Sequence, residues 1–175
     1  MQPINEESLR KGYRLAVYIC CAMIASVFVY TGVVEYLAAK NAPFHGFSPL
    51  PAAVYDKLRL ILFGVALVDF ALIPFIRNSA LKAGGRPGTA PVANLPGPVG
   101  RLITVSLITF ALCESIAIYG LVLFLINGGR PEFYLFLIIA LAAFAIHFPR
   151  YTSWEEWLRG MPEGENGFTG VGPLR

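Results

Sequence analysis

The chain has 175 residues, of which 56% are hydrophobic and only 14% are charged, and its mean hydropathy is +0.61. The length fits one domain, but this composition excludes an ordinary soluble globular protein. The net charge of +3 does not indicate a nucleic-acid partner, because basic residues in membrane proteins mainly record topology. We therefore predict an all-α integral membrane protein whose main partner is the lipid bilayer.

Four apolar stretches are long enough, or nearly long enough, to cross the roughly 30 Å hydrocarbon core of a bilayer. They predict transmembrane helices at about 15–39, 58–76, 102–126 and 132–149. The first stretch is much longer than the roughly 7–15 apolar residues of a secretory signal, so we expect it to be retained. The sequence NGGRPEF between the last two stretches is typical of a tight turn. Together these features predict a four-helix transmembrane bundle over residues 1–150, ending in an antiparallel hairpin.

The distribution of basic residues predicts the orientation of this bundle. Ten of the 14 Lys and Arg residues lie on the side of the two termini, and four lie on the other side. We therefore expect a multi-pass protein of the bacterial inner membrane with both termini in the cytoplasm. The cytoplasmic connection at 78–101 is rich in Gly, Ala and Pro without an apolar period, so we expect it to be flexible.

Residues 151–175 follow the last predicted span and begin with an amphipathic pattern. Ser153, followed three residues later by Glu156, is typical of a capping box at the start of a helix. Trp154 and Trp157 fall on one side of that helix. The pattern predicts a short helix in the cytoplasmic interface, with both tryptophans as anchors among lipid headgroups and a mobile Gly-rich tail after it. Docking to a partner protein is the alternative role for this helix.

Two carboxyl side chains lie deep inside the predicted spans. Asp69 is eight residues from Arg77, about 12 Å along a helix, and Glu114 is thirteen residues from Arg101, about 20 Å from the same side. An acid at such depth is unfavourable by several kcal/mol unless it is protonated, paired or in contact with water. No Lys or Arg lies at the same depth, so we expect protonation, with protons shared if the two carboxyls are close. Helix rotation decides that distance, and the sequence leaves it open.

Neighbouring residues suggest a packed polar site around these acids. Pro74 cannot donate a backbone hydrogen bond, which frees the carbonyl of Phe70, beside Asp69, to hold water or a cation. Small residues near Glu114 let another helix approach closely. The alternative is purely structural: a neutral acid can hydrogen-bond across helices and add packing specificity, and the available partners are Ser26, Tyr30, Thr31 and Tyr119.

The stretch ALCESIAIYGLVLFLI, residues 111–126, resembles the carboxylate-bearing helix of the rotary ATP synthase proteolipid, the c subunit. In that family a membrane-centred acid carries the transported proton or sodium ion. The resemblance implies that Glu114 binds the ion, with Ser115 and Tyr119 as its neighbours. The rest of the chain, with four predicted spans, is more similar to small bacterial membrane proteins of no assigned function.

The remaining reactive side chains predict no cofactor and no metal site. Cys20, Cys21 and Cys113 all fall in apolar helices, where cysteine behaves as a small hydrophobic residue. His147 is expected at the membrane interface, because no second His or Cys lies at ligand spacing. No nucleophile, base and acid occur in a catalytic arrangement, so we expect no enzymatic activity.

Two functional hypotheses remain. In the first, the chain is a membrane subunit in which Glu114, with Asp69, binds and releases a proton or cation. In the second, it is a non-catalytic accessory or scaffold protein that packs against other membrane subunits, or against itself, through small-residue stripes and the tryptophan-bearing helix.

Overall fold

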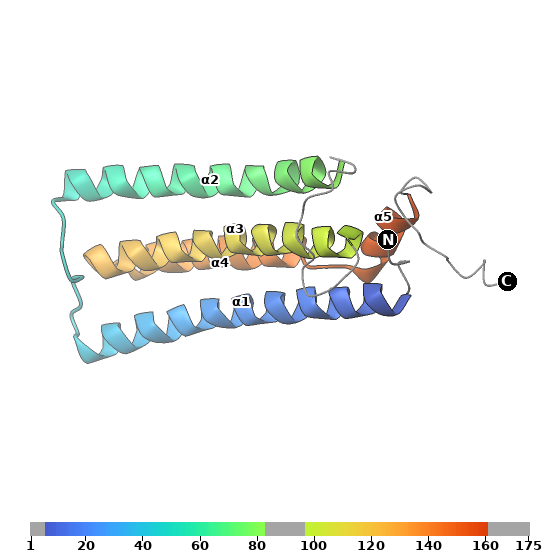
Figure 1. Ribbon diagram of the computed structural model, residues 1–175. Helices are drawn as coiled ribbons and strands as arrows, with labels where there is room; N and C mark the ends of the chain where they lie inside the picture. The colour runs from blue at the N-terminus through green and yellow to red at the C-terminus, as the bar shows by residue number, and fades with distance from the viewer. Residues whose placement is uncertain (1–5, 83–96, 161–175) are drawn as a thin grey trace.

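The computed structural model describes residues 6–82 and 97–160, and every regular element in these ranges is an α-helix. The all-α prediction is therefore confirmed (Figure 1). Most of the connection that we predicted to be flexible, and the predicted mobile tail, lie outside the described residues, at 83–96 and 161–175. The helices are α1 (Glu6–Lys40), α2 (Ala52–Lys82), α3 (Gly97–Asn127), α4 (Arg130–Ile146) and α5 (Tyr151–Arg159).

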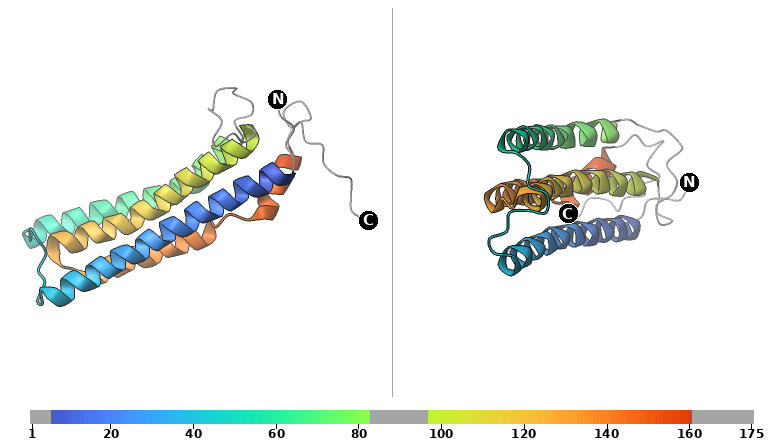
Figure 2. Two further views of the ribbon diagram at one scale, coloured as in Figure 1. Left: turned by 60° about the horizontal axis from the view of Figure 1, so that its bottom comes forward. Right: turned by 90° about the vertical axis from the view of Figure 1, so that its left-hand side faces the viewer.

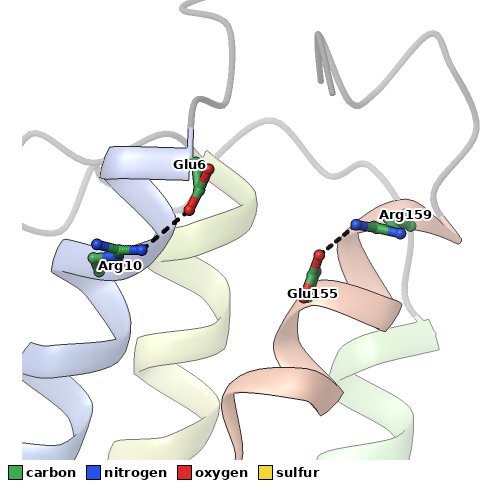
Figure 3. Close-up of polar contacts among 4 residues, drawn as sticks. All are labelled: Glu6, Arg10, Glu155 and Arg159. Carbon is green, nitrogen blue, oxygen red and sulfur yellow. Dashed lines mark hydrogen bonds and ion pairs between the residues drawn. The ribbon is translucent and has the colours of Figure 1, made fainter. Parts of the chain in front are cut away.

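The first three helices extend beyond the apolar stretches from which they were predicted. An apolar stretch indicates which part of a helix can lie in the hydrocarbon core of a membrane. The helix itself can be longer, because backbone hydrogen bonding continues into polar sequence. At the start of α1 the extension carries ion pairs one turn apart, such as Glu6 with Arg10 at 3.2 Å (Figure 3). The start of α2 is fixed by Pro51, whose carbonyl accepts the backbone N–H groups of Val54 and Tyr55.

Helix α3 is the central element of the fold. It packs against α1, α2 and α4, and α1 also contacts α4 and α5. Figures 1 and 2 show α1 and α2 on opposite sides of the α3–α4 pair. The turn at Gly128 and Gly129 joins α3 to α4 as an antiparallel hairpin, as predicted. Gly120 permits this close packing, because a Cβ there would lie 2.7 Å from the Cβ of Phe136.

The core is dominated by phenylalanine. Five rings from α3 and α4 are almost fully buried, and they are Phe110, Phe124, Phe133, Phe136 and Phe144. They form ring contacts along the hairpin, for example between Phe110 and Phe144 with centroids 6.3 Å apart. Burying an aromatic side chain is favourable by about 1.5–3 kcal/mol, so this row holds α3 and α4 together as a rigid pair.

The loop between α1 and α2 closes the end of the molecule opposite α5. Phe44 packs on Phe124 with ring centroids 5.0 Å apart, and the N–H of Phe47 donates to the carbonyl of Leu125 at 2.8 Å. Gly46 and Gly128 both have positive φ, +84° and +73°. A Cβ on either glycine would collide with a backbone carbonyl of the facing segment, so the loop and the α3–α4 turn need glycine at both positions.

Three helices are long and apolar enough to be candidate membrane spans, namely α1, α2 and α3. Helix α4 has 17 residues, and it meets the same test only together with α5, from which it is separated by a bend of 48°. The described part of the chain therefore has three candidate spans, or four if α4 and α5 count as one broken span. Large apolar side chains remain exposed along α1 and α2, such as Phe28 and Leu60.

Helix α5 corrects two predictions. It begins at Tyr151, two residues before the predicted cap Ser153, and its N-cap residue Arg150 makes no side-chain capping bond. The packing of Tyr151 edge-on against Tyr13 of α1, with centroids 5.4 Å apart, sets this earlier start. The second correction concerns Trp154, which is only 3% exposed and packs in a cluster with the ends of α1 and α3. This burial does not match a place among lipid headgroups.

The other predicted anchor, Trp157, is half-buried in the same region. The guanidinium of Arg101 on α3 lies 6.0 Å from the centre of its ring, close enough for a cation–π interaction. The apolar face of α5 is thus used by the protein itself.

Candidate functional site

Glu114 lies on the side of α3 that faces α1, and it is half-buried. Its Oε1 accepts hydrogen bonds from the hydroxyls of Ser26 and Tyr30 on α1, at 2.5 and 2.7 Å. Residues four apart share a helix face, so Ser26 and Tyr30 reach the same carboxyl oxygen from one side. Both residues were among the four possible partners that the sequence offered.

Asp69 lies on the side of α2 that faces α3 and is 9% exposed. Its Oδ2 accepts hydrogen bonds from the hydroxyls of Ser115 and Tyr119 on α3, at 3.0 and 2.8 Å. The family resemblance implied that Ser115 and Tyr119 would be neighbours of Glu114. The structure turns their hydroxyls to the other acid, because successive positions on α3 face different helices.

The two acids are therefore held in the same way. In each case a serine and the tyrosine four residues after it, SVFVY on α1 and SIAIY on α3, present two hydroxyls to one carboxyl of the next helix. We name this arrangement the serine–tyrosine clamp. The clamps form a row across α1, α3 and α2, in which Glu114 and Ser115 are adjacent in the chain. No hydrogen bond within the described part of the chain joins the two carboxyls directly.

Each clamp has more hydrogen-bond contacts than hydroxyl protons. The Oγ of Ser26 lies 2.6 Å from the carbonyl of Met23 as well as 2.5 Å from Glu114. The Oγ of Ser115 lies 2.8 Å from the carbonyl of Leu112 and 3.0 Å from Asp69. A hydroxyl carries one proton, so one serine cannot donate to both oxygens at once.

A proton on the carboxyl supplies the hydrogen that these contacts lack. The carboxyl O–H can then donate to the serine Oγ, the serine can donate to its own helix carbonyl, and the tyrosine hydroxyl can still donate to the carboxyl oxygen. Without that proton, two oxygens at hydrogen-bond distance have no hydrogen between them. The geometry at Glu114 and at Asp69 therefore suits a bound proton.

No basic side chain balances either acid within residues 6–82 and 97–160. The ion pairs in this range lie elsewhere, at the ends of the helices. Arg59 of α2 pairs with Glu132 of α4 at 3.5 Å, and Arg130 of α4 pairs with Glu35 of α1 at 3.9 Å. These two pairs tie three helices together at the end opposite α5, well away from the clamps.

The remaining predicted residues have the following places. Pro74 lies inside α2, which continues past it to Lys82. Phe70 is partly exposed, and its ring meets that of His147 edge-on with centroids 6.4 Å apart. The freed carbonyl of Phe70 stays a prediction. Thr31, a further possible partner of Glu114, donates instead to the carbonyl of Val27 in its own helix.

The partners of Asp69 are the main feature that the sequence analysis missed. A signal for them was present, because a serine followed four residues later by a tyrosine occurs in two of the predicted spans.

Comparisons of this chain with protein-family models, with curated proteins and with solved structures find no match. The candidate site therefore has to be interpreted from its geometry alone.

Proposed function

We propose that the protein is a multi-pass protein of the bacterial inner membrane, with both termini cytoplasmic, in which Glu114 and Asp69 bind and release protons. The observation that carries this proposal is the repeated serine–tyrosine clamp, where a proton on the carboxyl satisfies every hydrogen-bond contact. The candidate spans α1, α2 and α3, with their exposed apolar side chains, support the membrane location.

The clamps favour a proton over a metal cation as the bound species. In each clamp the carboxyl oxygen touches the hydroxyls at 2.5–3.0 Å, so these oxygens leave no space between them for an ion. Hard cations need several oxygen ligands at roughly 2.0–2.6 Å from the metal, spread around it rather than in contact with one another. Binding a cation would require the clamps to open, whereas binding a proton requires only that hydroxyls rotate.

The arrangement also supports exchange between the two sites. Ser115, which contacts Asp69, follows Glu114 directly in α3, so the two carboxyls lie at similar height on either side of α3. A carboxyl and a hydroxyl can each donate and accept, and chains of such groups pass protons in membrane proteins. We propose that Glu114 and Asp69 are successive proton-binding sites of one pathway.

The rival proposal is an accessory or scaffold protein that docks to other membrane subunits. Two surfaces suggested for that role are occupied within the chain itself: Trp154 of α5 is buried against α1 and α3, and the small residue Gly120 of α3 packs on Phe136 of α4. The exposed apolar faces of α1 and α2 suit lipid as well as a protein partner. The geometry therefore supports proton binding better than docking.

Carbodiimide labelling of the protein in membranes tests the proposal, since the reagent modifies protonated carboxyls. Labelling is measured across pH and located by mass spectrometry. We expect modification at Glu114 and Asp69 that fades as pH rises, and its loss at each site in Glu114→Gln and Asp69→Asn. Glu35, which is exposed and ion-paired, provides the internal comparison. Absence of labelling at both clamp acids at every pH would favour the structural alternative.

A further inference from the structure

A small cavity lies at the α5 end of the molecule, between α2, α3, the end of α4 and α5. Its volume is about 30 Å³, enough for one or two water-sized groups, and it is open on one side. Its polar lining comes from five residues on four elements, and they are Arg77, Ser106, Thr109, His147 and Ser153. Neither clamp acid lines it, so this cavity is separate from the carboxyl sites described above.

The lining of this cavity is rich in hydrogen-bond donors and contains no carboxylate. Arg77 supplies a guanidinium with several N–H donors, and three residues supply hydroxyls. The cavity also contacts Trp154 and Trp157. A concave site with one permanent positive charge and several hydroxyl donors has the chemistry of an anion site.

Arg77 is half-buried, yet it forms no ion pair with any residue that the structure describes. Three acids at this end of the molecule, Glu6, Glu7 and Glu155, form ion pairs within their own helices. Glu155 of α5 turns along its own helix to Arg159, and Glu6 of α1 does the same to Arg10 (Figure 3). A partly buried guanidinium without a counter-ion is unfavourable, and an anion in the cavity would neutralise it.

Thr109 provides a second, independent indication. It is only 3% exposed, lines the cavity, and makes no hydrogen bond to another described residue. The two other threonines described inside long helices, Thr31 and Thr104, each donate to a carbonyl one turn earlier in their own helix. Thr109 thus differs from both, as expected for a hydroxyl that serves a ligand.

We propose that this cavity binds a phosphate group through Arg77, Thr109 and Ser106. The bidentate fork of arginine matches the oxygens of a phosphate, and the hydroxyls supply further donors. The cavity admits one or two phosphate oxygens, while the remainder of the ligand stays at its open side. The source of the group is either free inorganic phosphate or the headgroup of an anionic phospholipid.

The tryptophans make the site directly observable, because the chain has two and both line the cavity. Purified, delipidated protein in a neutral detergent is titrated at constant ionic strength with sodium phosphate, and separately with short-chain phosphatidylglycerol, while tryptophan emission is recorded. Arg77→Gln and Thr109→Val are compared with Arg10→Gln, which removes the same charge from an exposed residue at the same end. Circular dichroism checks that each variant is folded.

We expect a saturable emission change in the wild type and in Arg10→Gln, with affinity reduced at least tenfold in Arg77→Gln and severalfold in Thr109→Val. A response to both ligands or to phosphate alone indicates a site for the free anion, and a response to phosphatidylglycerol alone indicates a headgroup site. No saturable change with either ligand would overturn the proposal. Equal affinities for the wild type and both cavity variants would do so as well, whatever the outcome of carbodiimide labelling at the clamps.

Discussion

The protonation state of Glu114 can be tested by comparing two substitutions at that position. In Glu114→Gln the amide nitrogen takes the place of Oε1, and its two N–H groups can donate to Ser26 and Tyr30. Ser26 is then free to donate to the carbonyl of Met23, which is the pattern we infer for the protonated acid. In Glu114→Ala both interhelical bonds and the Cγ methylene are lost, while Cβ remains as the alanine methyl group.

The expected magnitudes differ enough to be distinguished. Hydrogen bonds between helices in membranes contribute about 0.6 kcal/mol on average and up to about 1.7. The alanine variant loses two such bonds plus part of the burial of one methylene, at about 0.8 kcal/mol when fully buried, so we expect a loss of about 1.5–2 kcal/mol. The glutamine variant keeps two contacts, and we expect it to lose less than about 1 kcal/mol.

The assay is reversible unfolding in mixed micelles, followed by circular dichroism, with Glu35→Gln as a control at an exposed, ion-paired acid. If Glu114 were instead an ionised carboxylate, its bonds would be charge-assisted and worth about 1.5–3 kcal/mol each. Replacing it with a neutral amide would then be about as damaging as replacing it with alanine. Equal destabilisation by the two substitutions would refute the inference that the Glu114 carboxyl carries a proton.

Three further predictions concern the surrounding structure. Gly120→Val should lower the free energy of unfolding by about 1–3 kcal/mol and separate the α3–α4 hairpin, because even a Cβ would meet the facing α4 side chain at 2.7 Å; thermal unfolding measures the loss. Tyr55→Phe should leave stability unchanged or raise it, because the buried Tyr55 hydroxyl has no hydrogen-bond partner among the described residues; a clear loss of stability would show that a partner exists. The pKa of Glu7 is lowered below 4.5, first by the hydrogen bond from Lys11 and then by its charge, so this pair stabilises the fold above that pH and the effect fades as pH falls through the lowered pKa. NMR titration should show the lowered pKa, and Lys11→Gln should return it towards 4.5.

The positions of the helices could be predicted because apolar length and turn residues are local properties of the sequence. The apolar run around Glu114 marks the middle of α3, and the pair of glycines after Asn127 marks the turn that follows. Helix ends were less predictable, because ion pairs and prolines rather than hydropathy decide where α1 and α2 begin and end.

The carboxyl partners could be predicted only in part. Ser26 and Tyr30 were foreseeable as partners because few polar groups occur at the depth of Glu114. The choice between Glu114 and Asp69 for Tyr119 was not foreseeable, because it depends on the rotation of α3, which the phenylalanine row against α4 fixes. The burial of Trp154 was missed for a similar reason, since an amphipathic pattern shows which face is apolar but not whether lipid or protein covers it.

If the clamps bind protons as proposed, proton binding is coupled to helix packing. In the described part of the chain, α2 packs mainly on α3, and the contacts of Asp69 with Ser115 and Tyr119 are the polar link between these helices at mid-height. Rotating α3 to improve the contacts of Glu114 with α1 would carry Ser115 with it, because the two residues are adjacent on one rigid helix. Under the proposed function, a change of protonation at Glu114 would therefore alter the geometry available to Asp69. Two carboxyls that share no hydrogen bond can still respond to each other through the helix between them.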